Sequence, residues 1–151
     1  MHVNAMTTLA RKALLFVGAF GSLSAIVGGI GILGTNGLGM PLSLLRGSPF
    51  TSFIVPGIIL LVVVGGTQAS ATIALALRQR AAYLWMSIAG FGMVIWILVE
   101  VAILPGFSPI QALYFGVGII ELMLVLAVIG VLPQPSRVPV TGPSGRAVVI
   151  P

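Results

Sequence analysis

Residues 81–104, AAYLWMSIAGFGMVIWILVEVAIL, and residues 110–132, IQALYFGVGIIELMLVLAVIGVL, are two long apolar stretches separated only by PGFSP. Each is long enough to cross the roughly 30 Å hydrocarbon core of a bilayer as an α-helix. A connection this short makes the two predicted helices antiparallel neighbours. This pair of stretches therefore predicts a helical hairpin inside a membrane.

Two further apolar stretches, residues 13–34 and 53–77, precede the hairpin. The first is longer than the 7–15 apolar residues of a signal peptide, so we expect it to be retained as a membrane span. Hydrophobic residues make up 58% of the chain and charged residues 6%, against roughly 25% charged residues in a soluble domain. The chain is therefore predicted to be an all-α integral membrane four-helix bundle, with one membrane domain over residues 13–132.

The basic residues predict how the four spans are oriented. Six of the seven lie on one side of the membrane: Arg11, Lys12, Arg78, Arg80, Arg137 and Arg146. Only Arg46 lies on the other side, and positive charge favours the cytoplasm, so both termini are expected there. The N-terminal segment is residues 1–12. The cytoplasmic tail, residues 133–151, is rich in proline, and we expect it to be extended or disordered.

The connection between the first two spans has recognisable local signals. Residues 41–46, PLSLLR, are apolar enough to form a short helical turn at the membrane surface. Residues 48–57, SPFTSFIVPG, carry prolines and hydroxyl groups that can cap the free amides at the start of the second span. With the glycine-rich first span, the short basic second loop and QALYF at residues 111–115, this run resembles a family of small four-span proteins from actinobacteria. The resemblance implies a plasma-membrane location and no catalytic residues.

Small residues recur at three- and four-residue steps in the first two spans. The predicted helix-packing residues are Gly18, Gly21, Ala25, Gly28, Gly66 and Ser70. Small residues on one stripe let helix backbones approach closely, as in GxxxG pairs. Such a stripe serves either packing inside the bundle, which a four-helix protein favours, or contact with a second copy.

The two acidic residues of the chain both lie inside predicted spans, where a carboxylate costs a few kcal/mol on insertion scales. Glu121 lies near the middle of the fourth span, on one helical face with Gln111, Tyr114 and Gly118. A mid-membrane polar cluster of Glu121 with Gln68 and the hydroxyl of Ser24 is therefore predicted.

Glu100 lies nearer the outer end of the third span. Gln111 and the loop residue Arg46 are expected at the same level, so these three residues form a second predicted cluster, which could include an ion pair. For each glutamate two interpretations stay open. Its carboxyl group fixes the register of neighbouring helices, or it binds a proton or cation during transport.

The residue inventory argues against an enzyme. The chain has no cysteine, its single histidine is His2 outside the spans, and it has no phosphate-binding Gly-Lys loop and no HExxH pair. No catalytic, cofactor or metal residues are therefore expected, and the scattered basic residues do not predict nucleic-acid binding. The expected partners are the lipid bilayer and a membrane protein or further copies of the chain.

The leading functional hypothesis is a non-enzymatic scaffold or accessory subunit that acts through helix–helix association. The alternative is a small proton- or cation-coupled transporter or channel that uses Glu121, assisted by Gln68.

Overall fold

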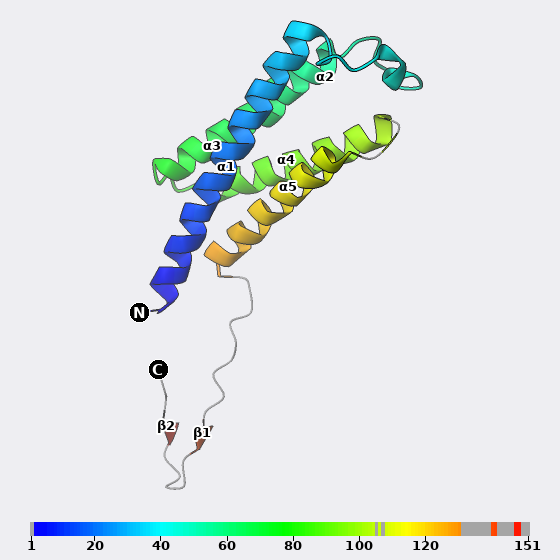
Figure 1. The fold of residues 1–151 in the computed structure, drawn as a ribbon. Coiled ribbons are helices and arrows are strands. Elements are labelled where there is room, and N and C mark those ends of the chain that lie inside the picture. The colour runs from blue at the N-terminus through cyan, green and yellow to red at the C-terminus, as the bar shows by residue number, and fades with distance from the viewer. Residues whose placement is uncertain (1, 105, 107, 131–139, 142–146, 149–151) are drawn as a thin grey trace.

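The computed structural model describes residues 2–104, 106, 108–130, 140–141 and 147–148, with side chains described between Thr7 and Gly130. Within these residues the chain forms four helical segments, each long and apolar enough to cross a membrane (Figure 1). They are α1 (His2–Thr35); a second segment made of α2 (Ile54–Ile58), η2 (Ile59–Gly65) and α3 (Gly66–Ala76); α4 (Ala82–Ile103); and α5 (Pro109–Val128). The predicted architecture of four membrane-spanning helices is confirmed.

Little of the predicted tail is described. Two short strands, β1 (Val140–Thr141) and β2 (Ala147–Val148), pair antiparallel with Val140 opposite Val148. The prediction of an extended or disordered tail otherwise falls on residues outside the described part of the chain.

The second and third helical segments end within one residue of the predicted spans, but α5 ends at Val128, earlier than the predicted Leu132. Ile129 is its C-cap, and Gly130 follows in the left-handed region with φ of 77°. Glycine adopts this conformation without the steric cost that a Cβ atom brings, so it commonly ends a helix at this position. The conformation of Gly130 thus ends α5 before the last apolar residues of the predicted span.

The four segments close into a ring of neighbours. The first helix, α1, packs against the α2–η2–α3 segment on one side and against α5 on the other, while α4 packs against α3 and α5. Figure 1 shows α4 and α5 running antiparallel as the hairpin that the short connection predicts. In this ring α3 and α5 lie across the bundle from each other, so a contact between them must pass through the interior.

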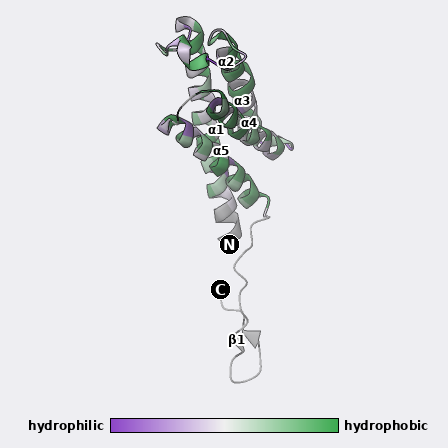
Figure 2. Cartoon of the chain, turned by 90° about the vertical axis from the view of Figure 1, so that its right-hand side faces the viewer, coloured by the Kyte–Doolittle hydropathy of each residue, from purple (hydrophilic) through white to green (hydrophobic). Residues whose placement is uncertain are grey.

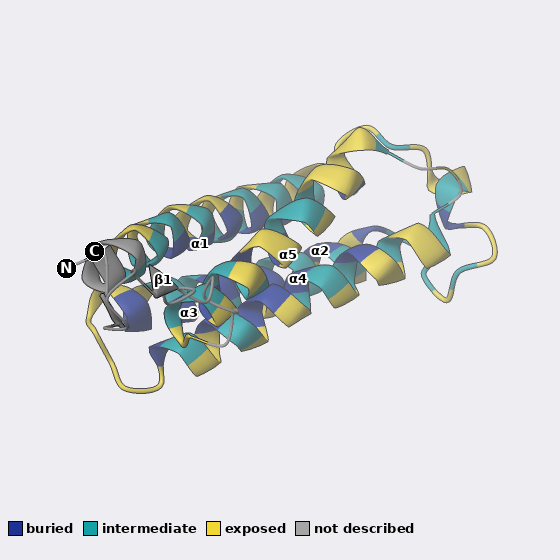
Figure 3. Ribbon diagram, turned by 90° about the horizontal axis from the view of Figure 1, so that it is seen from below, coloured by how far each residue is buried: buried dark blue, intermediate teal, exposed yellow. Residues whose placement is uncertain are grey.

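The interior is small and the outer surface is apolar. In an apolar stretch of 18 residues within each span, only 22–33% is buried inside the protein. The buried residues line the inner faces, while exposed residues cover the outer faces (Figure 3). Figure 2 shows the helices mostly white to green, with purple gathered at the connections. Apolar outer faces are what lipid tails require, and close helix packing inside must come from shape and hydrogen bonds.

The connection after α1 contains η1 (Leu42–Leu45), a 3₁₀ turn that confirms the predicted helical turn. The predicted capping of the second span by hydroxyl groups is wrong. Phe53 is the N-cap of α2 and makes no side-chain capping bond. The hydroxyl of Ser48 instead donates to the Leu45 carbonyl oxygen at 2.8 Å, because a serine at a turn satisfies its nearest backbone acceptor. The Phe53 N–H donates to Asn36 Oδ1 at 3.1 Å, which ties the start of α2 to the end of α1.

Within the second segment, η2 is a π-helical stretch of 7 residues. A π-turn holds more residues than an α-turn, so it changes the direction in which the following side chains point. Both Val64 and Gly65 are buried at its end, and Gln68 in the next turn of α3 is fully buried. The stretch therefore helps set the face of α3 that enters the bundle.

Candidate functional site

A buried polar pair joins α3 to α5 inside the bundle. The Gln68 Nε2 atom donates a hydrogen bond to Glu121 Oε2 at 2.8 Å, and both residues have 0% exposure. On α5 the buried positions are Gln111, Gly118, Glu121 and Val125, which share one helical face. Because α3 and α5 lie across the ring, this bond crosses the centre of the bundle.

The small residues of α1 make room for this pair. A Cβ atom at Gly21 would lie 3.2 Å from Gln68 Oε1 and 3.3 Å from Gln68 Cδ, so the amide packs directly on the α1 backbone. One turn away, the Thr72 hydroxyl donates to the Gln68 carbonyl oxygen at 2.8 Å. A Cβ atom at Gly18 would lie 2.5 Å from that hydroxyl oxygen. Gly18 and Gly21 therefore let polar groups of α3 fit against α1.

The pair is incompletely satisfied. Gln68 Oε1 and Glu121 Oε1 are both buried, and neither has a hydrogen-bond partner among the residues that the structure describes. A buried acceptor without a donor loses its hydration and gains nothing in return, at a cost of about 1–3 kcal/mol. Chemically, the site holds two acceptor oxygens that a proton, a small cation or another donor would satisfy.

Ser24, the third predicted member of the mid-membrane cluster, is not part of it. Its hydroxyl donates to the carbonyl oxygens of Phe20 at 2.7 Å and Gly21 at 3.1 Å, both on its own helix. A serine within a helix commonly bonds the carbonyl one turn earlier, which removes its donor from the interior. The structure thus brings Glu121 and Gln68 together and leaves Ser24 out.

The outer cluster of Glu100, Gln111 and Arg46 does not assemble, and this prediction is corrected. Gln111 Oε1 accepts from the Ser108 N–H at 3.0 Å, while Ser108 Oγ accepts from the Ile110 N–H at 3.3 Å. Gln111 therefore belongs to a capping box that begins α5.

The other two members of that cluster have separate environments. The Trp96 side chain lies beside the Glu100 carboxyl group, one turn earlier on α4. Arg46 is exposed at the end of η1. In the part of the chain that the structure describes, no ion pair joins Arg46 to Glu100.

The predicted packing residues divide between two environments. In the first span Gly18, Gly21 and Ala25 are buried and Gly28 is half-buried. The same stripe includes Gly29, where a Cβ atom would lie 2.9 Å from the Leu61 backbone nitrogen. In the second span Gly66 has open space where a Cβ atom would be, and Ser70 is exposed. The α1 stripe therefore packs inside the bundle, while the α3 stripe faces outward.

A basic cavity at one end of the bundle is absent from the sequence prediction. It lies where the start of α1 meets the turn between α3 and α4, and Arg11 and Arg78 contribute to its lining. The sequence signal for this cavity is the pair of basic clusters at residues 11–12 and 78–80. In the sequence analysis these clusters serve only to orient the spans. Their meeting at one cavity depends on the packing of α1 against α3.

Comparison with known proteins gives no match: no protein-family model, no curated protein and no solved structure is similar to this chain. The resemblance to the actinobacterial four-span family stays a prediction.

Proposed function

We propose that this multi-pass membrane protein is a non-enzymatic scaffold or accessory subunit of a bacterial plasma membrane, acting through helix–helix association. The distribution of basic residues favours a cytoplasmic location for both termini. The chain has no cysteine of its own. A cysteine introduced at Ser43 should therefore react with a membrane-impermeant label in intact cells, and its protection would contradict this orientation.

The observation that carries the proposal is the outward stripe on the second span. Gly66 and Ser70 lie one turn apart with exposed apolar residues on either side of them, Val62 and Ile73. Small residues on a lipid-facing surface let another helix approach closely, and a hydroxyl can then bond across the contact. The Ser70 hydroxyl has no hydrogen-bond partner among the described residues, so it is available for such a bond.

The remaining polar groups of the spans support a structural use of the interior. Gln68 and Glu121 are both fully buried, and Gly18 and Gly21 of α1 pack against α3. Association surfaces must then be sought on the outer faces, and the α3 stripe offers both small size and an unpartnered donor.

Replacing Gly66 by leucine tests this proposal. A Cβ atom at Gly66 meets nothing within 4 Å, so the variant should fold, while its side chain blocks a helix from approaching the stripe. We expect native mass spectrometry of protein gently extracted from its own host to show wild type bound stoichiometrically to a partner or a second copy. The Gly66→Leu variant should lose at least nine tenths of that complex, in line with a coupling of about 1.4 kcal/mol or more.

The matched control is Gly92→Leu, which adds the same side chain at an equally open position on α4. It should leave the complex intact. A wild-type protein that is monomeric and alone, or equal losses in the two variants, would contradict the proposal.

A second candidate is a small proton- or cation-coupled transporter or channel that uses Glu121. The observation in its favour is the pair of unpartnered acceptors, Gln68 Oε1 and Glu121 Oε1, at the centre of the bundle. Ionisable groups inside a membrane commonly mark ion or proton pathways. Here the carboxyl group would bind the coupling ion, and the amide of Gln68 would orient it.

The Glu121→Gln variant tests the second candidate. It keeps an oxygen to accept from Gln68 Nε2 but cannot ionise, so helix packing should be nearly unchanged. If Glu121 couples transport, proton flux into proteoliposomes that carry a membrane potential should fall to the level of empty vesicles. Equal flux in the variant and wild type would exclude this role.

A further inference from the structure

A cavity opens where three helix ends meet at one end of the bundle. It has a volume of about 390 Å³ and is lined by Thr8, Arg11, Leu75, Arg78, Gln79, Ala82 and Tyr83. Arg11 comes from α1, Leu75 from the end of α3 and Tyr83 from the start of α4, so the cavity exists only in the folded bundle. Its volume is within the range of small-molecule sites.

The backbone holds this cavity in a defined shape. After α3, Arg78 is in the left-handed region with φ of 55°. The Gln79 N–H donates to the Ala74 carbonyl oxygen at 2.9 Å and the Arg78 N–H donates to the Leu75 carbonyl oxygen at 3.2 Å. These are the two bonds of a Schellman motif. The turn that carries Arg78 is therefore fixed by its own hydrogen bonds.

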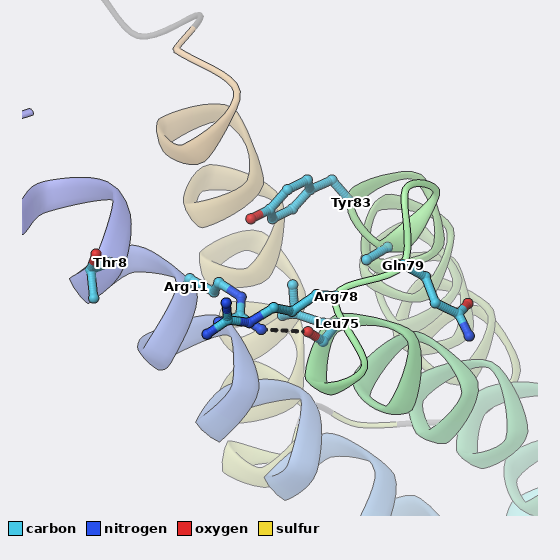
Figure 4. Close-up of a pocket in the computed structure, with 7 residues that line it drawn as sticks. Thr8, Arg11, Leu75, Arg78, Gln79 and Tyr83 are labelled. Atoms are coloured by element: carbon cyan, nitrogen blue, oxygen red, sulfur yellow. Dashed lines mark hydrogen bonds between the residues drawn. The ribbon is translucent and has the colours of Figure 1, made fainter. Parts of the chain in front are cut away.

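Arg11 is positioned by a bond to the same carbonyl group. Its Nη2 atom donates to Leu75 O at 2.8 Å, which places the guanidinium at the negative end of α3 (Figure 4). One bond uses one of the five N–H donors of an arginine. No other hydrogen bond of this guanidinium is found in the described part of the chain, so its remaining donors are available to a ligand. Figure 4 also shows the Gln79 amide directed away from the arginines.

The charges of the cavity are unbalanced. None of its lining residues is acidic, and the two acidic residues of the chain, Glu100 and Glu121, lie elsewhere in the spans. Two guanidinium groups that line one cavity repel each other unless an anion lies between them, because both are always ionised. Two forked donors, one on α1 and one on the turn after α3, match the oxygens of a phosphate group.

We infer that this cavity binds a phosphate group, supplied by the headgroup of an anionic phospholipid. The cavity lies at the ends of membrane spans, the level at which headgroups lie. Leu75, Ala82 and the ring of Tyr83 give it an apolar wall beside the two arginines. Basic pockets between membrane helices bind anionic headgroups in this way. Inorganic phosphate has the same chemistry without the acyl chains, so the test must separate the two sources.

The experiment uses the full-length protein in nanodiscs of phosphatidylcholine, with and without phosphatidylglycerol. Native mass spectrometry counts the lipids retained, and a thermal melt gives the midpoint of unfolding. We expect wild type to retain phosphatidylglycerol and to melt at a higher temperature when it is present. The double variant Arg11→Gln with Arg78→Gln should bind it roughly thirtyfold more weakly, since each arginine near the surface contributes roughly fivefold.

Arg46→Gln is the matched control, because Arg46 is exposed in the connection between α1 and α2, away from the cavity. It should bind as wild type does. Arg78→Gln alone, expected to bind about fivefold more weakly, covers the case in which the double variant does not fold, because the Arg78 side chain makes no hydrogen bond within the described residues.

A separate measurement in detergent adds inorganic phosphate at constant ionic strength. Stabilisation by phosphatidylglycerol alone identifies the lipid headgroup as the source. Stabilisation by phosphate as well supports the site and shows that the phosphate group suffices. The inference is overturned if neither ligand raises the unfolding temperature of wild type, or if Arg78→Gln responds as strongly as wild type.

Discussion

Replacing Gly29 by alanine should lower the free energy of unfolding by about 3 kcal/mol, the upper part of the range for overpacked cores. A Cβ atom there would lie 2.7 Å from Leu61 Cβ and 2.9 Å from both Leu61 Cα and the Leu61 backbone nitrogen. Two of these are backbone atoms of the facing helix and the third is a Cβ atom attached directly to that backbone, so no side-chain rotation can relieve the contact. The variant must separate α1 from η2, and the packing between them is lost along the interface.

The neighbouring residue supplies the control. A Cβ atom at Gly28 would meet only Leu60 Cδ2 at 3.5 Å, an ordinary contact. Gly28→Ala should therefore be neutral or stabilising by up to about 1 kcal/mol, because alanine favours helix more than glycine does. Unfolding by SDS in mixed micelles, followed by the fluorescence of Trp85 and Trp96, measures both variants. Equal stability of Gly28→Ala and Gly29→Ala would show that α1 and η2 are not in close backbone contact.

Replacing Gln68 by methionine should lower the free energy of unfolding by about 2 kcal/mol. Methionine has nearly the volume of glutamine, so packing against Gly21 is largely kept while the Nε2 donor is lost. Glu121 is then buried without any hydrogen-bond partner among the described residues, since Gln68 is the one it has. A buried acceptor that loses its donor costs more than the bond itself contributed.

The double variant separates the bond from the packing. Gln68→Met combined with Glu121→Met removes both polar groups, and its stability should return to within about 1 kcal/mol of wild type or exceed it. The same unfolding assay completes a double-mutant cycle. Additive losses in the two single variants would mean that the side chains do not interact, contrary to the 2.8 Å bond in the structure.

Part of the site was predictable from local patterns. The helical spacing of Gln111, Gly118 and Glu121 placed these residues on one face of α5, and all three are buried. Matching positions along the spans then put Gln68 beside Glu121. The prediction for Ser24 was wrong because its hydroxyl donates to a nearer carbonyl oxygen on its own helix. The role of Gln111 was also readable, since Ser108 three residues earlier completes the S-x-x-Q spacing of a capping box.

Other features required the folded bundle. The stripes of α1 and α3 look alike in sequence, yet Gly21 is buried against Gln68 while Gly66 is open. The spacing of small residues shows that they share one face of a helix. It does not show which helix lies against that face. The π-helical stretch η2 changes the side-chain direction before Gln68, and local hydropathy does not encode that change. Arg11 and Arg78 meet only because α1 packs beside the end of α3.

The sequence by itself determined the number of spans, their approximate ends and the antiparallel hairpin, because bilayer thickness and backbone hydrogen bonding constrain each span separately. Only the tertiary structure decided which small residues pack inside, which polar groups pair and where the basic cavity forms. Nearly every side chain of a span is apolar enough for either lipid or protein, so burial cannot be read from hydropathy. It follows instead from which backbones can approach each other, as Gly29 and Leu61 do.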